Sequence, residues 1–102
     1  MIYITQLIFV REGKEEIFHQ FEDHALPLLG KHNGRILYRV RPDMNSFISG
    51  NKERPYEIHL VSFDSEKDLE NYLKDDSRLK FIHLKEESVK SVLLVKGSAM
   101  GK

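Results

Sequence analysis

Two side chains of the predicted sheet, Arg39 and His59, could take part in acid–base or charge-stabilising chemistry. Arg39 lies in 35–41, a segment whose residues alternate as in a half-buried strand. The alternation places Arg39 with Leu37, facing away from the helices. A partly buried guanidinium there would suit a carboxylate, or would stabilise an enolate oxygen during a reaction. The alternative is a structural ion pair with Glu57, or exposure to solvent.

His59 belongs to the next predicted strand, 56–63, and alternation places it on the helix-facing side beside Val61. A histidine in that position is either a core residue with satisfied hydrogen bonds or a general base. The sequence leaves both roles open, and His59 is the only histidine for which we weigh a catalytic role.

Hydroxyl-bearing side chains share the outer face of the predicted sheet with Arg39. They are Tyr3, Thr5, Tyr56 and Ser62. Hydroxyls on an apolar wall can orient a small ligand, and Tyr3 or Tyr56 could donate hydrogen bonds to a developing oxyanion. The same groups could instead form hydrogen bonds across a dimer interface.

The sequence contains little that could bind a metal or a cofactor. His19 and Asp23 are four residues apart on a predicted helix, a spacing that could supply two ligands. They are not part of an H-E-x-x-H motif, and the chain has no cysteine. We therefore expect no metal site and no cofactor.

The elements that position these residues follow the order β-α-β-β-α-β. Strands are predicted near residues 2–10, 35–41, 56–63 and 89–95, with amphipathic helices after the first and third. Right-handed crossovers then give a ferredoxin-like α+β sandwich, in which a four-stranded antiparallel sheet carries two helices on one face. We expect one domain at 1–96 and a flexible tail at 97–102. The outer face, which carries Ile58 and Leu60, is not covered by these helices and must pack against something else.

Composition narrows the possible partners. The 102 residues include 16 Lys plus Arg and 16 Asp plus Glu, so the net charge is zero without histidine. This balance argues against nucleic acid and anionic membranes as partners. The first strand resembles an RNA-recognition motif, but Ile58 and Leu60 occupy the positions of the base-stacking aromatics. The apolar N-terminal run is too short to span a bilayer, and we expect a cytoplasmic protein.

Two longer segments resemble the small DUF1330-like proteins of the dimeric α+β barrel superfamily. Residues 26–39, L-P-L-L-G-K-H-N-G-R-I-L-Y-R, are similar to the family's helix end, glycine turn and strand closing on arginine. Residues 60–65, L-V-S-F-D-S, are similar to its strand exit, and Tyr72 stands at a common aromatic position. Asn33 and Val40 occupy positions at which family members commonly have glycine.

The resemblance implies a homodimer in which two sheets pack face to face and cover Tyr3, Leu7, Ile58 and Leu60. It implies an uncharacterised small-molecule-binding or enzymatic protein with a cavity near Arg39, on the sheet face that is turned inward in the dimer and away from the helices. Two alternatives come from the same superfamily: a cofactor-independent monooxygenase-like enzyme, and a non-catalytic structural or stress-response module.

Overall fold

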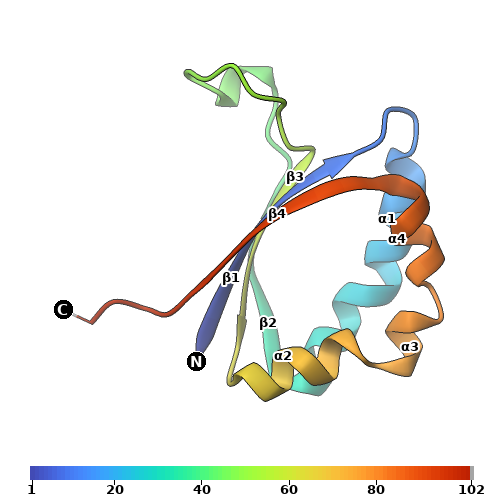
Figure 1. Ribbon diagram of the computed structural model, residues 1–102, viewed down its shortest axis with the longest axis vertical. Helices are drawn as coiled ribbons and strands as arrows, with labels where there is room; N and C mark the ends of the chain where they lie inside the picture. The colour runs from blue at the N-terminus through green and yellow to red at the C-terminus, as the bar shows by residue number, and fades with distance from the viewer. Residues whose placement is uncertain (102) are drawn as a thin grey trace.

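The computed structural model describes residues 1–101 and contains one antiparallel four-stranded sheet with its main helices on one side (Figure 1). The elements are β1 (Ile2–Val10), α1 (Glu15–Ala25), the 3-10 helix η1 (Leu26–His32), β2 (Gly34–Val40), η2 (Met44–Ser46), β3 (Glu57–Phe63), α2 (Glu66–Leu73), α3 (Asp76–Leu79), α4 (Ile82–Ser88) and β4 (Val89–Gly97). The strand order is β2-β3-β1-β4, which confirms the predicted ferredoxin-like fold.

Local sequence signals account for several helix boundaries. The Ser65 hydroxyl accepts a hydrogen bond from the Asp68 backbone N–H at 3.1 Å and so caps the start of α2. Asn33, with a φ of 56°, ends η1 in the left-handed conformation. Asp75 caps α3 by accepting from the Ser77 N–H at 2.8 Å. The second helical region is therefore divided into three short helices, α2, α3 and α4.

A β-bulge in β2 reverses the predicted orientation of Arg39. Ile36 lies opposite Val61, but two residues later Tyr38 lies opposite Leu60, so Leu37 is the extra residue. Beyond the bulge Arg39 lies opposite His59 and shares its helix-facing side. The prediction that Arg39 points away from the helices is wrong, because a single inserted residue changes the face of every following side chain.

The two faces of the sheet differ in their cover. Beneath the helices, Ile4 and Ile8 of β1 and Val61 and Phe63 of β3 are buried. The outer face carries apolar side chains from all four strands, including Tyr3, Leu7, Tyr38, Val40, Ile58, Leu60, Leu93 and Val95. Tyr38 is 67% exposed on it. The loop from Pro42 to Pro55 projects away from the helices (Figure 1).

Candidate functional site

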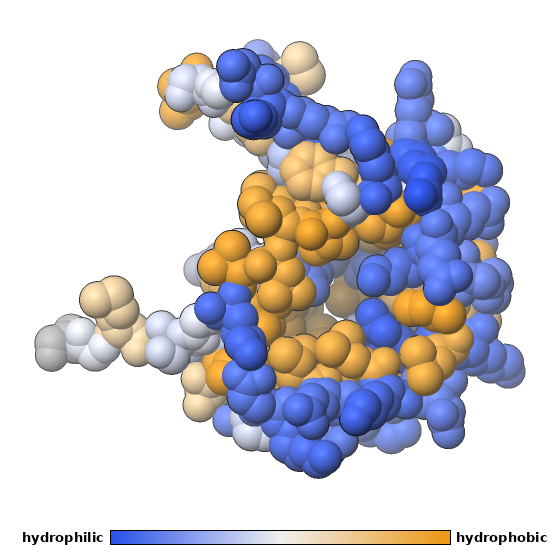
Figure 2. Space-filling view, viewed as in Figure 1, coloured by the Kyte–Doolittle hydropathy of each residue, from blue (hydrophilic) through white to orange (hydrophobic). Residues whose placement is uncertain are grey.

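A cavity of about 300 Å³ lies between the sheet and the helices. Its apolar wall includes Ile4, Ile8, Val61 and Phe63 from the sheet and Phe18, Phe21 and Leu29 from α1 and η1. Six polar or charged side chains interrupt this wall: Gln6, Glu22, His59, Tyr72, Arg78 and Lys85. Figure 2 shows the hollow, with orange apolar side chains around it and hydrophilic residues among them. An apolar wall with a few converging polar groups is typical of a small-molecule site.

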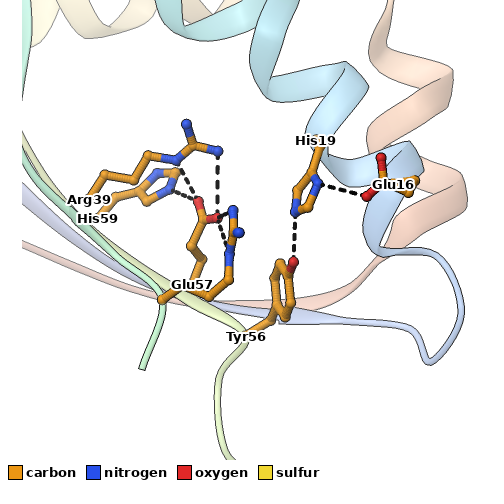
Figure 3. A network of polar contacts seen from close by, with 7 residues as sticks. Glu16, His19, Arg39, Tyr56, Glu57 and His59 are labelled. Atoms are coloured by element: carbon orange, nitrogen blue, oxygen red, sulfur yellow. Dashed lines mark hydrogen bonds and ion pairs between the residues drawn. The ribbon is translucent and has the colours of Figure 1, made fainter. Parts of the chain in front are cut away.

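On the helix-facing side of β3, two residues before His59, Glu57 is the acceptor for three basic side chains (Figure 3). Its Oε1 accepts from Arg39 Nε at 2.8 Å and lies 2.6 Å from His59 Nε2, while Oε2 accepts from Arg41 Nη2 at 2.6 Å. Burial, at 1% exposure, would raise the pKa of Glu57, but these hydrogen bonds outweigh burial and lower the pKa to about 2. The carboxylate is therefore ionised at neutral pH.

This carboxylate fixes the orientation of His59. Because an ionised carboxylate can only accept, His59 Nε2 must carry a proton and donate it to Glu57. The imidazole lines the cavity, and its Nδ1 has no hydrogen-bond partner among residues 1–101. A neutral His59 would thus present a basic lone pair at Nδ1, and a protonated one would present a second donor.

Glu22 is the acidic group of the cavity and was not among the site residues predicted from the sequence. It projects from α1 and is 7% exposed, and its side chain forms no hydrogen bond or ion pair with residues 1–101. Burial raises the pKa of its carboxyl to about 7, against the opposing attraction of His59. A sequence signal existed: Glu22 occupies an apolar-stripe position between Phe18, Phe21 and Ala25.

Two cations, Arg78 of α3 and Lys85 of α4, also line the cavity. The Arg78 guanidinium is 5.2 Å from the centroid of the Tyr72 ring and 5.5 Å from that of Phe21. Burial, together with repulsion from Arg78, lowers the pKa of Lys85. These groups give one cavity a carboxyl, an imidazole and two cations. Such a set can bind an anion or move a proton.

The predicted site residues do not form one cluster. Tyr3, Thr5 and Ser62 lie on the outer face, where Tyr3 is paired with Ser62 across β1 and β3. Arg39 lies on the opposite side, bound to Glu57, and does not line the cavity. Of the two residues expected to act catalytically, the cavity wall contains His59 alone. Grouping Arg39 with the outer hydroxyls was wrong because of the bulge in β2.

Tyr56 was also expected on the outer face, but the structure places it against α1. Its hydroxyl lies 2.6 Å from His19 Nε2, and the Glu16 carboxylate is 3.4 Å from the other nitrogen of that ring (Figure 3). Tyr56 precedes the first residue of β3, so the strand alternation does not apply to it. Residues 1–101 contain no cluster of three or more His, Cys, Asp or Glu side chains that could hold a metal, and none of their helices could cross a membrane.

Comparison with known proteins finds similar folds but no matching family. No family model and no curated protein matches the chain significantly. A crystal structure of RPA0582, a protein of unknown function from Rhodopseudomonas palustris, is similar with a TM-score of 0.86 and 11% identity, over 99% of this chain and 83% of that one. At3g17210 from Arabidopsis thaliana has a TM-score of 0.75 and 13% identity, over 100% and 98%.

An uncharacterised NIPSNAP domain protein from Burkholderia xenovorans is also similar. Its TM-score is 0.71 and its identity is 13%, over 98% of this chain and 95% of that one. Identities this low show the fold alone. The chain thus shares the ferredoxin-like fold of these proteins.

Proposed function

We propose that this protein binds a small, largely apolar molecule in the cavity between sheet and helices and performs proton-transfer chemistry on it. One observation carries the proposal: Glu22 is held without a partner in an apolar cavity that it shares with His59. An unpaired buried carboxyl is costly for folding, so its presence in the cavity favours a functional role. As part of this proposal we assign the chain to the DUF1330-like proteins. The support is the resemblance of residues 26–39 and 60–65 to that family.

In the proposed reaction Glu22 acts as the base. Its carboxylate accepts a proton from a carbon adjacent to a carbonyl, and the C–H electron pair moves to the carbonyl oxygen as an enolate. The proton returns to the same carbon, so no cofactor is required. His59, oriented by Glu57, is available as a hydrogen-bond donor or acceptor at Nδ1. Arg39 takes part as a positioning residue, through its hydrogen bond to Glu57.

Glu22→Gln is expected to slow the proton transfer strongly. The probe is 2-tetralone, a neutral ketone whose acidic C–H positions exchange with D₂O and are followed by NMR. We expect the native protein to accelerate exchange, with a rate that rises with pH through about 7, because Glu22 must be ionised to accept a proton. Loss of the carboxylate should lower the accelerated rate about 100-fold, within the range for a general base.

Asp23→Asn provides the matched control, because Asp23 is an exposed acid on the same helix. It should leave the exchange rate and its pH profile unchanged. Equal rates for the two variants would contradict the assignment of Glu22. Binding of the ketone without accelerated exchange would remove the catalytic part and leave a non-catalytic binding protein.

We also propose that a second copy of the chain covers the outer sheet face. The support is the apolar character of that face across all four strands, including Leu7, Ile58, Leu60 and Leu93. A monomer would leave this contiguous patch in water, and such patches usually mark interfaces. A neutral chain also lacks the net charge that would oppose self-association.

A further inference from the structure

The part of the cavity wall formed by α3 and α4 holds a buried guanidinium with an unused donor. Arg78 is 8% exposed, and its Nε is buried without a hydrogen-bond partner among residues 1–101. The contact of Nη1 with the Leu73 carbonyl oxygen is long, at 3.5 Å. No carboxylate of the described chain lies within ion-pair distance of Arg78. A buried charge with an unsatisfied donor costs several kcal/mol of stability as an order of magnitude, unless a partner arrives.

Lys85 adds a second cation to the same wall. It is partly buried, and none of residues 1–101 forms an ion pair with it. Burial and then Arg78 lower the pKa of Lys85, which means that its charged form is held at a cost. Glu22 does not neutralise the pair, because it lies beyond ion-pair distance and burial keeps its carboxyl partly protonated at neutral pH. The cavity therefore carries a surplus of positive charge.

We propose that Arg78 and Lys85 form an anion subsite that binds the carboxylate of a small monocarboxylic acid, whose apolar body fills the rest of the cavity. The inference rests on the proposed function, since it names the ligand class of the same cavity. The apolar wall of Ile4, Phe18 and Val61 would receive the body of the ligand.

The geometry of Arg78 favours a carboxylate over a larger anion. The rings of Phe21 and Tyr72 lie close to the guanidinium, and its Nε is the donor that has no hydrogen-bond partner among residues 1–101. Two N–H groups on one guanidinium edge match a planar carboxylate. A volume of about 300 Å³ corresponds to about ten water-sized groups, the size of an eight-carbon acid. A phosphate dianion would meet stronger repulsion from the neighbouring Glu22.

Binding of the anion should be coupled to protonation of Glu22. The charged groups that face Glu22 are His59, Glu57 and Arg39 from the sheet and Arg78 from α3. Lys85 is the fifth, from α4. A bound carboxylate would neutralise cations that now stabilise ionised Glu22, and would add its own repulsion. Protein and ligand together should therefore take up a proton near pH 7, and binding should strengthen as the pH falls from 8 to 6.

The test compares octanoate with octanamide, which has the same chain and no charge, by isothermal titration calorimetry. The native protein should bind octanoate at least tenfold more tightly. Arg78→Met should lower octanoate affinity at least tenfold and leave octanamide affinity within twofold. Lys80→Met removes an exposed cation next to α3 and should change neither. Lys85→Met serves as a second, less buried test if Arg78→Met fails to fold, and should weaken octanoate selectively.

Equal affinities for octanoate and octanamide would overturn the anion subsite and leave the cavity function intact. If neither octanoate nor octanamide binds while 2-tetralone still exchanges through Glu22, the anion subsite is overturned and the acid–base role of Glu22 is not. Octanoate selectivity without any accelerated exchange would instead overturn the acid–base role of Glu22. The two proposals therefore fail in distinguishable ways.

Discussion

Replacing Glu57 by glutamine is expected to lower the free energy of unfolding by about 3 kcal/mol. The substitution keeps the side-chain volume, but it places an NH₂ donor against Arg39, Arg41 and His59, all of which donate to Glu57. One oxygen remains in glutamine, so the NH₂ group faces either Arg41 or the pair of Arg39 and His59. The two arginines reach solvent, which limits the loss, whereas His59 is buried. Urea denaturation of the variant and the native protein measures the change.

The pH dependence of stability provides a second signature of the same carboxylate. The folded-state pKa of Glu57, about 2, lies below its usual 4.5. Its stabilising contribution is therefore complete above about pH 4.5 and is lost as the pH falls toward 2. The glutamine variant should lack this part of the acid limb. Glu53→Gln, which breaks an exposed pair with Lys90, should cost less than about 1 kcal/mol. Equal losses for Glu53→Gln and Glu57→Gln would contradict the role of Glu57.

The fold could be predicted from the sequence because its signals are local and agree with one another. β1 and β3 carry apolar residues on both sides, as central strands do, and both are central. Ser65 and Asp68 form a cap at the start of α2, a pair that is close in the sequence. The division of the chain after Leu73 into the short helices α3 and α4 was harder to predict, because such short segments depend on tertiary contacts.

The site was less predictable, and the bulge at Leu37 explains part of the difference. The residue type at position 37 does not signal a bulge, because bulges are determined by pairing with the neighbouring strand. Strand alternation therefore assigned Arg39 to the wrong face, although Glu57 was weighed as its partner. His59 was assigned to the correct face, because β3 is regular throughout.

Glu22 and Arg78 were missed for different reasons. Glu22 interrupts an apolar helical stripe, and this signal was visible in the sequence. Arg78 lies on α3, a helix of four residues, too short for a periodic pattern to show which side is buried. Its burial follows from the packing of α3 against α1, which only the folded structure specifies.

Leu60→Arg is expected to convert a dimer into a monomer. Leu60 lies on the outer face of the central strand β3, opposite Thr5 of β1 and Tyr38 of β2. In the proposed dimer an arginine there would bury an unpaired charge at the interface, which weakens association by several kcal/mol. We expect the dissociation constant to rise at least 100-fold, measured by light scattering over a dilution series.

The same substitution separates dimerisation from the cavity, because the two use opposite faces of the sheet. In the isolated chain an arginine at position 60 can reach solvent, so the fold and the binding of octanoate should persist. Leu79→Arg places the same charge on an exposed position of α3 and should leave the dimer intact. A native protein that stays monomeric at all concentrations would contradict the interface. Loss of octanoate binding on monomerisation would show instead that packing of the second copy on the outer face stabilises the cavity on the other face of the sheet.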